Sequence, residues 1–556
     1  MKLRKHQQAM LDIINGIVAG ANIKNIVADV VPGGGKSLLP VIAAGNLIPA
    51  GLAVKIAWIC PRMSLQDQGE RVFLEPGFRR LLGHNLAIRS STNQANPCRG
   101  FSGWISTYQA LAVDKDKTAL RDFERYPYIL VLDEWHHLAE EGEWTKPIQE
   151  LYERAAYRVL LTGTLSRGDK GKIAFIPYAQ AGKDEFRPCF DACDDTAVIE
   201  YGRKEALSER AIIPLEFAFF DGMAEWQKES GKVTRAKLST SRVDANQALF
   251  TALKTEYATE LLTAGVAHWK NHTRTVNKNG SLMVVAANIE TAKGYLDQLR
   301  RMGCQAEIAT SEDTPEAIKQ IKALRAGKLK IMVAVAMISE GLDVPSISHI
   351  IYLTNVRTIE WIEQTISRAV RIDPQAGPYE TQKGYIFAPA DLMFTELAKK
   401  IEQDQCDAVA IQKNGNGDGP TKGEGEGEGG GRPGIKPLSS RLIREQGEMF
   451  DYPQERPYLI DPTPSKTVSE QETDTLGQIE SHIRRFAFNN RYSPKRLNAE
   501  IYEHFGKPRR SMTLRELRLC LDWVRLTYPI QYIRGTGRAR APIKASAYPC
   551  EWRAAQ

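Results

Sequence analysis

The chain has 556 residues, of which 42% are hydrophobic and 25% are charged, close to the averages of folded globular proteins. No run of about 18 apolar residues occurs, and Asp12 and Asn15 interrupt the apolar N-terminal stretch, which argues against a membrane span and a signal peptide. Eight scattered cysteines indicate reduced thiols rather than a disulfide framework. We therefore expect a cytoplasmic protein of several domains with no membrane partner.

Apolar strand-like runs alternate with helical stretches in the first 200 residues. The expected strands cover residues 25–31, 55–60, 104–106, 128–132 and 158–162. Such alternation predicts a parallel sheet covered by helices, and ligands of these sheets bind at the carboxyl ends of the strands. We expect residues 1–200 to form one α/β domain with its site at that edge.

A glycine-rich turn follows the first of these strands and precedes an apolar helix expected over residues 37–47. The turn reads Val31-Pro32-Gly33-Gly34-Gly35-Lys36-Ser37. In such a turn backbone N–H groups surround phosphate oxygens, the lysine reaches the β- and γ-phosphates, and the serine hydroxyl reaches Mg²⁺. Val30 stands where the strict pattern has glycine, so an ordinary turn between a strand and a helix is the alternative.

An acidic pair, Asp133 and Glu134, ends the expected strand at 128–132 and is followed by Trp135 and His136. An aspartate in this place can hold the metal of a bound nucleoside triphosphate, and the glutamate beside it can orient the attacking water. Taken alone, the pair could be a solvated turn. Together with the glycine-rich turn, it predicts a site that binds a nucleoside triphosphate with Mg²⁺ and hydrolyses it.

A second α/β pattern follows a connector. Residues 201–275 are expected to be this connector, with a helical stretch over 246–269, and residues 276–405 a second domain. The expected strands of that domain cover residues 281–287, 305–308, 331–335, 349–353 and 384–387. Near its end, Gln364, Arg368 and Arg371 are spaced four and then three residues apart, which predicts one shared helix face. A solvated basic face is the alternative.

These patterns, in this order, resemble the superfamily 2 helicases, in the branch whose second signature reads Asp-Glu-x-His, and in particular bacterial restriction-motor subunits and repair helicases. The segments that carry the resemblance are residues 3–7, 31–37, 59–68, 105–109, 133–136, 161–164, 339–345 and 364–371. The resemblance implies two RecA-like lobes that close on ATP. Val335 stands where the family often has threonine, which we interpret as a subfamily feature.

The resemblance also implies a role for each matching residue. The ATP-binding residues would be Arg4, Gln7, Pro32, Gly33, Gly34, Gly35, Lys36, Ser37, Gly341 and Asp343. Ser37 and Asp133 would hold Mg²⁺, while the catalytic set would be Glu134, His136, Gln364, Arg368 and Arg371, with Arg371 stabilising charge on the transferred phosphoryl group. Contacts to nucleic acid would come from Pro61, Arg62, Thr107, Tyr108 and Gln109, and Thr162 and Thr164 would couple the two sites.

The end of the chain differs in composition from the rest. Residues 406–475 are expected to be a flexible, mostly irregular linker, because ten glycines occur between positions 413 and 437. Residues 476–556 carry 16 Lys/Arg against 6 Asp/Glu, interleaved with Phe486, Phe488, Tyr492 and Phe505. This pattern favours a small, mainly helical module that binds nucleic acid. A solvated cationic face and a protein-docking surface remain alternatives.

The predicted architecture is therefore α/β: two tandem RecA-like parallel-sheet domains form a helicase core, and a small helical domain follows a glycine-rich linker. The expected function is an ATP-dependent helicase or translocase that acts on nucleic acid, with DNA favoured over RNA by the resemblance. The alternatives are an RNA helicase and a nucleic-acid-stimulated ATPase that remodels or recruits a partner protein without unwinding. A third is a recruitment adaptor, in which the C-terminal domain supplies the biological action and the motor serves as a switch. A nuclease on another chain is a possible protein partner.

Overall fold

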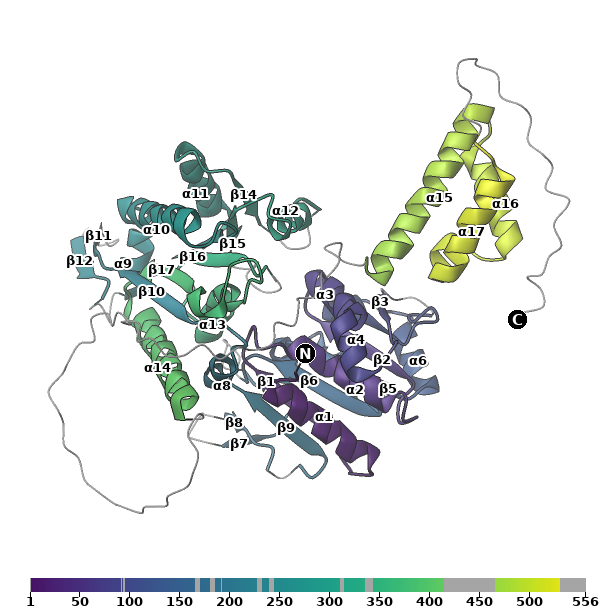
Figure 1. Ribbon diagram of the computed structural model, residues 1–556, viewed down its shortest axis with the longest axis horizontal. Helices are drawn as coiled ribbons and strands as arrows, with labels where there is room; N and C mark the ends of the chain where they lie inside the picture. Colours follow the sequence, from purple (N-terminus) through teal and green to yellow (C-terminus); the bar gives the residue numbers. More distant parts are fainter. Residues whose placement is uncertain are drawn as a thin grey trace, which may run out of the picture.

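The computed structural model describes residues 2–91, 93, 96–165, 171–180, 186–191, 193–227, 233–239, 245–310, 315–335, 344–414 and 466–530. These residues form two α/β lobes and a three-helix module, which stands beside the first lobe (Figure 1). Residues 415–465, where most of the glycine-rich linker is expected, lie outside the described residues. None of the described helices has an apolar stretch long enough to cross a membrane.

Lobe 1 is built on a parallel sheet in the order β3-β4-β2-β5-β6-β1-β9. Its strands are β1 (Asn25–Val30), β2 (Lys55–Cys60), β3 (Ile88–Ser90), β4 (Gly103–Thr107), β5 (Tyr128–Asp133), β6 (Tyr157–Thr162) and β9 (Thr196–Tyr201). Its helices are α1 (Lys5–Val18), α2 (Leu39–Leu47), α3 (Met63–Leu74), α4 (Pro76–Leu82), α5 (Tyr108–Ala112), α6 (Thr118–Arg125) and α7 (Thr145–Arg154), and a short hairpin joins β7 (Tyr178–Gln180) to β8 (Phe186–Pro188). The five strands expected here lie where the sequence placed them.

Lobe 2 is built on a second parallel sheet, in the order β10-β17-β16-β13-β15-β14. Its strands are β10 (Leu215–Phe220), β13 (Ser281–Ala286), β14 (Ala306–Ala309), β15 (Ile331–Val335), β16 (Ile347–Leu353) and β17 (Gly384–Pro389). Its helices are α8 (Arg203–Ser208), α9 (Ala245–Ala252), α10 (Glu256–Thr275), α11 (Ile289–Arg301), α12 (Pro315–Arg325), α13 (Ile359–Ile366) and α14 (Leu392–Asn414), with a hairpin of β11 (Met223–Gln227) and β12 (Val233–Lys237). The predicted fold class, two parallel-sheet lobes with a helical C-terminal region, is confirmed.

The segment expected to be a helical connector also contributes to the second sheet. Strand β10 pairs with β17 in parallel along its whole length. Helix α14 then holds this edge of the sheet, because the Gln405 side chain accepts a hydrogen bond from Leu215 N at 2.6 Å and donates one to Leu215 O at 3.1 Å. Helix α14 continues to Asn414, past residue 405, where we expected the second lobe to end.

The C-terminal module consists of α15 (Val468–Asn490), α16 (Pro494–Phe505) and α17 (Leu514–Thr527) around a hydrophobic core of its own. Helix α15 begins eight residues before position 476, in a stretch that we expected to be irregular. The reason is a capping box, in which Glu470 N donates to Thr467 Oγ1 at 3.2 Å and Thr467 N donates to Glu470 Oε2 at 2.9 Å. The mostly irregular segment expected up to Thr475 therefore ends earlier.

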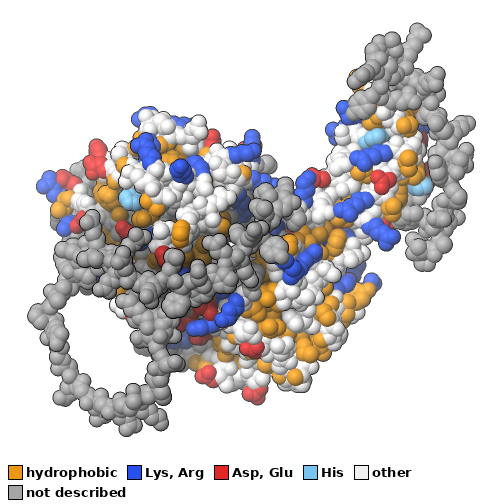
Figure 2. Space-filling model, viewed as in Figure 1, with side chains coloured by type: hydrophobic (Ala, Val, Ile, Leu, Met, Phe, Trp, Pro, Cys, Tyr) orange, Lys and Arg blue, Asp and Glu red, His pale blue; other side chains and the backbone are white. Residues whose placement is uncertain are grey.

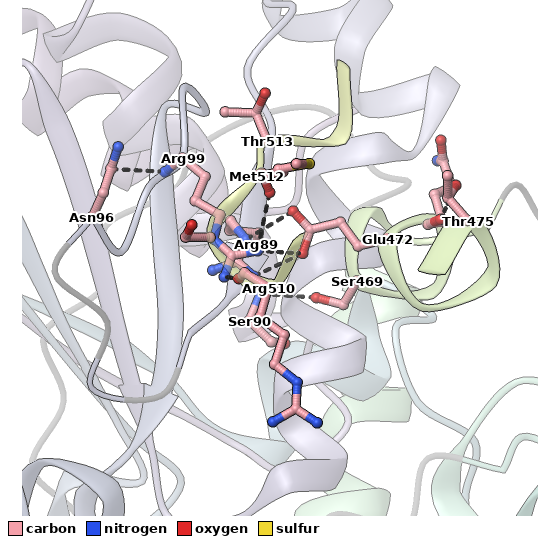
Figure 3. A network of polar contacts seen from close by, with 12 residues as sticks. Arg89, Ser90, Asn96, Arg99, Ser469, Glu472, Thr475, Arg510, Met512 and Thr513 are labelled. Atoms are coloured by element: carbon pink, nitrogen blue, oxygen red, sulfur yellow. Dashed lines mark hydrogen bonds and ion pairs between the residues drawn. The ribbon is translucent and has the colours of Figure 1, made fainter. Parts of the chain in front are cut away.

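A polar anchor, formed chiefly by Glu472, Arg89 and Arg99, fixes the first turns of α15 to lobe 1 (Figure 3). Arg89 Nη2 lies 2.7 Å from Glu472 Oε2, and Arg99 Nη1 lies 3.7 Å from the same oxygen. Glu472 is 5% exposed and Arg89 4%. Arg99 also donates to the backbone carbonyls of Arg510 and Met512, so the turn that precedes α17 contacts the anchor as well.

The anchor predicts a measurable change on replacement of Glu472 by glutamine. Removing one partner of a buried ion pair leaves charge without compensation, at a cost of about 3–5 kcal/mol. Amide hydrogen exchange in the first turns of α15 should therefore accelerate by about a hundredfold or more. Glu480→Gln, on an exposed part of the same helix, serves as the control and should leave exchange unchanged. Equal protection in both variants would show that the anchor does not hold the module.

Candidate functional site

A pocket between the two lobes collects side chains from distant parts of the chain. We call it the inter-lobe pocket, and it lies at the carboxyl ends of β1 and β5. Lobe 1 contributes Pro32, Gly33, Gly35, Lys36, Ser37, Trp58, Pro61, Leu65, Gln68, Gly69, Asp133 and Glu134, and lobe 2 contributes Gln364, Arg368 and Arg371. The glycine-rich turn, the acidic pair and the two arginines, which lie far apart in the sequence, thus share one cavity.

The glycine-rich turn has a backbone that requires glycine at two positions. Gly33 and Gly35 have φ values of +89° and +92°, in the region that side-chain-bearing residues rarely adopt. A Cβ atom at Gly35 would lie 2.8 Å from the Arg4 guanidinium. Val30, where the strict pattern has glycine, is instead the last residue of β1 and is fully buried. The glycine positions that the turn needs are therefore all downstream of it.

A 3₁₀ turn, Lys36–Leu38, follows the glycines and leads into α2. The expected helix over residues 37–47 is thus present, with a tighter first turn. Arg4 and Gln7, at the start of α1, lie behind the glycine-rich turn: Arg4 Nη1 donates to Gly34 O at 2.6 Å, and Gln7 Nε2 donates to Gly35 O at 3.2 Å. In this conformation both side chains support the turn and neither lines the pocket.

The acidic pair is held by buried neighbours. Trp58 Nε1 donates to Asp133 Oδ2 at 3.3 Å, and the Tyr108 hydroxyl donates to Asp133 O at 2.9 Å. Burial raises the pKa of the Asp133 carboxyl to about 6, against the lowering effect of Lys36. A carboxylate and the Ser37 hydroxyl on the rim of one pocket form an oxygen donor set that suits Mg²⁺.

Glu134 contacts the lysine of the glycine-rich turn. Its Oε1 atom forms an ion pair with Lys36 Nζ, and its backbone lies in the left-handed region at φ +48°. Burial acts to raise the pKa of Glu134, but the charges of Lys36 and His136 outweigh it, so the pKa is lowered overall. The carboxylate is therefore ionised and can accept a proton from a water molecule.

His136 links the two lobes. One ring nitrogen, Nδ1, lies 3.0 Å from the Thr162 hydroxyl, and the other, Nε2, lies 3.3 Å from Gln364 Nε2. The Thr162 hydroxyl in turn accepts from Thr164 N at 3.1 Å. The acidic signature, the hydroxyl-rich segment and the last signature thus form one continuous chain of polar contacts across the gap between the lobes.

The last signature does not lie on one continuous α-helix face, contrary to our expectation. Helix α13 ends at Ile366, residues Ser367–Val370 form a 3₁₀ turn, and Arg371 is extended with φ −74° and ψ 137°. The backbone leaves the helix because Val370 O accepts a hydrogen bond from Ile213 N at 2.9 Å. Gln364, Arg368 and Arg371 nevertheless all line the inter-lobe pocket.

The five residues expected to contact nucleic acid have different environments. Tyr108 is fully buried and its hydroxyl donates to Asp133 O, so its side chain supports the acidic pair in this conformation. Thr107 caps α5 by accepting from Ala110 N at 3.2 Å, and Pro61 lines the inter-lobe pocket. Gln109 is exposed and Arg62 is half-buried. Gly341 and Asp343, expected at the nucleotide, lie outside the described residues.

Two family models match the chain. The model of the helicase conserved C-terminal domain matches residues 260–373, and the model of the type III restriction enzyme res subunit matches residues 1–167. Over these residues the chain is similar to the superfamily 2 helicases that the sequence predicted. The two matches fall on the two lobes that form the inter-lobe pocket.

Several curated proteins are similar to this chain. The uncharacterized protein Rv2917 of Mycobacterium tuberculosis is 27% identical over 389 residues, which cover 69% of this chain and 61% of that protein. The match to ML1624 of Mycobacterium leprae is 26% identical over 385 residues and also covers 61% of the relative, so the chain spans about three fifths of these proteins. UvrABC system protein B of Halalkalibacterium halodurans is 28% identical over 134 residues, 23% of this chain and 19% of that protein.

Solved structures are similar to this chain as well. A fragment of a putative HsdR subunit of a type I restriction enzyme from Vibrio vulnificus YJ016 is 12% identical, with 71% of this chain and 65% of that chain covered and a TM-score of 0.44. The Hef helicase domain of Pyrococcus furiosus is also 12% identical, with 72% of this chain and all of that chain covered and a TM-score of 0.39.

Sequence reasoning missed some residues of the pocket. Trp58 was assigned only to a buried strand, because nothing in an apolar run indicates that an indole N–H will meet a carboxylate. Leu65, Gln68 and Gly69 of α3 also line the pocket. Gln68 ends the segment 59–68 of the family resemblance, and nothing in the local pattern indicates that its side chain lines the pocket.

Proposed function

We propose that the protein is an ATP-dependent helicase or translocase of nucleic acid, with DNA as its substrate. The observation that carries this proposal is the inter-lobe pocket, to which lobe 1 supplies Lys36 and Glu134 and lobe 2 supplies Arg371. A site completed by two lobes makes hydrolysis depend on their closure. The match to the restriction-enzyme subunit model favours DNA over RNA.

The proposed chemistry begins with the glycine-rich turn. The backbone N–H groups of Gly33 to Gly35 would surround the phosphates. The Arg4 and Gln7 side chains would leave the carbonyls of the turn and contact the adenine. The Lys36 ammonium, now on Glu134, would move to the β- and γ-phosphates. Glu134 would then be available to orient the attacking water and take its proton.

The remaining groups would stabilise charge on the transferred phosphoryl group. Ser37 and Asp133 would hold Mg²⁺, which supplies a positive charge at the phosphate oxygens when bound. Arg371, with Arg368 beside it, would approach from lobe 2.

We also propose a division of the chain into five parts, in which the β10 segment packs into lobe 2. The parts are close to residues 1–200, 201–275, 276–405, 406–475 and 476–556.

Nucleotide state would reach the strand-binding side through the His136 contacts. Closing or opening the lobes changes the distance between His136 and Gln364, and the other ring nitrogen contacts the Thr162 hydroxyl, which in turn accepts from Thr164 N. Arg62 and Gln109 on lobe 1, with the Gly341 and Asp343 region on lobe 2, would then contact the strand alternately.

We propose a cytoplasmic location and a second protein, such as a nuclease, as a partner.

The test compares ATP hydrolysis with single-stranded DNA, duplex DNA, single-stranded RNA and no nucleic acid. We expect DNA to raise the turnover of the wild type and RNA to have little effect, with Lys36→Ala inactive in every arm. A strand-displacement assay on the same preparations distinguishes a helicase from a translocase, because a translocase shows stimulated hydrolysis without displacement. A turnover that no nucleic acid changes would overturn the proposed function.

A further inference from the structure

A second hollow lies on the C-terminal module, remote in sequence from the residues of the inter-lobe pocket. It runs between α15 and the end of α17, and we call it the module groove. Its lining residues are Lys466, Thr473, Asp474, Gly477, Gln478, Ser481, His482, Arg485, Arg525 and Ile530. Figure 2 shows Lys and Arg side chains gathered on the visible face of this module.

The floor of the module groove is small and polar. Gly477 and Ser481 lie one turn apart on α15, and their small side chains leave the space that the groove occupies. Gln478 accepts a hydrogen bond from Arg525 Nη2 at 3.0 Å, which holds the guanidinium at the rim. Thr473, Gln478 and Ser481 therefore offer hydrogen-bonding groups along the groove, beside the apolar side chain of Ile530.

Positive charge surrounds this floor. Lys466, Arg485 and Arg525 line the groove, and all three are exposed. Among the described residues that line the groove, the acidic one is Asp474. It forms an ion pair with Lys466. With Lys466, Arg485 and Arg525 against Asp474, the groove has an excess of basic side chains, which favours an anionic ligand.

An exposed aromatic ring stands at the distal end of the same helix face. Phe488 follows Arg485 by three residues and Ser481 by seven, which places the three on one side of α15. Its side chain is 87% exposed, an unusual state for phenylalanine. From Asp474 to Phe488 the face extends about 21 Å, at about 1.5 Å per residue.

We propose that the module groove binds a single-stranded segment of nucleic acid. The cations would neutralise phosphates along the strand, and the Phe488 ring would stack against an unpaired base, the combination on which proteins rely for single strands. A duplex keeps its bases stacked inside and offers none to this ring. The inference rests on the proposed function, because it names the strand that the motor would hold outside its lobes.

The polar anchor gives the groove a fixed position relative to the motor. The N-terminal end of α15 is held on lobe 1, where the Ser469 backbone N–H donates to Glu70 Oε2 at 3.0 Å and Arg71 Nη2 lies 3.0 Å from Glu470 Oε1. Glu70 follows Gln68 and Gly69 on α3, which line the inter-lobe pocket. A strand in the groove would therefore keep a constant distance from lobe 1 while lobe 2 moves.

The experiment measures binding of the full chain to fluorescein-labelled oligo(dT), oligo(rU) and a hairpin duplex by anisotropy over a range of salt. Phe488→Ala should weaken binding of the single strands by about 5- to 100-fold. The double variant Arg485→Ser with Arg525→Ser should lower the slope of log K against log salt by about 1.4. Tyr502→Ala, 55% exposed, is the aromatic control, and Lys495→Ser with Arg515→Ser is the charge control.

The outcomes separate this inference from the proposed function. Hydrolysis without nucleic acid should match the wild type in all four variants, because none of these residues lines the inter-lobe pocket. The groove assignment would be overturned if the groove variants bound the probes like their controls, or if they lost affinity for duplex and single strands equally. Either result would leave the proposed function unaffected. A wild type that binds none of the probes would overturn both.

Discussion

Replacing Arg371 with alanine is expected to reduce ATP turnover by about 10³- to 10⁵-fold, the range in which an arginine supplied to a transferred phosphoryl group acts. The arginine belongs to lobe 2 but lines the pocket with Lys36 and Glu134, and its Cδ atom lies 3.7 Å from the position of a Cβ built on Gly33. Because its charge acts on the transition state, affinity for a fluorescent ATP analogue should change only a few-fold. Steady-state turnover and a binding titration measure the two effects.

Two further variants give this expectation its control. Arg210→Ala removes an exposed arginine that pairs with Glu380 on the surface and should leave turnover unchanged. Arg368→Ala should have a smaller effect than Arg371→Ala, because we assign the finger role to Arg371. A larger loss of turnover in Arg368→Ala would reverse that assignment. Near-normal turnover in both variants would show that the arginines of lobe 2 do not take part in hydrolysis.

Glu134→Gln is expected to lower turnover by about 10²- to 10⁴-fold while nucleotide binding persists. The glutamate is ionised, since Lys36 and His136 lower its pKa overall despite its burial, and the amide of glutamine cannot accept the proton of the attacking water. Glutamine also weakens the hold of residue 134 on Lys36, which leaves the ammonium available to phosphates. ATP turnover and analogue affinity, measured on the same preparation, test both parts.

Glu140→Gln is the matched control for this variant. Glu140 is an exposed acid six residues downstream and does not line the pocket, so its turnover should equal that of the wild type. Turnover of Glu134→Gln near the wild-type rate would show that another group activates the water. Loss of nucleotide binding in Glu134→Gln would instead indicate that the Lys36 contact organises the pocket itself.

Local patterns were sufficient to predict much of the two lobes. Buried parallel strands are continuous apolar runs, so β2 and β15 have the predicted bounds, and the phosphate turn needs glycines that are visible in the sequence. The capping box at Thr467 and Glu470 was also a local signal, although we did not use it to place the start of α15. Strand β10 was missed because an edge strand is identified by its partner, which lies about 170 residues away.

The sequence by itself determined the chemistry that can occur: a glycine turn with Lys36, an acidic pair ending a strand, and two arginines at helical spacing. Their residue types and local spacing carry this information, because backbone conformation and charge are properties of short segments. Only the tertiary structure decided which groups meet. It buried Tyr108 beneath Asp133, ended α13 before Arg371 and placed Glu472 against two arginines of lobe 1, since such contacts depend on packing between residues distant in the chain.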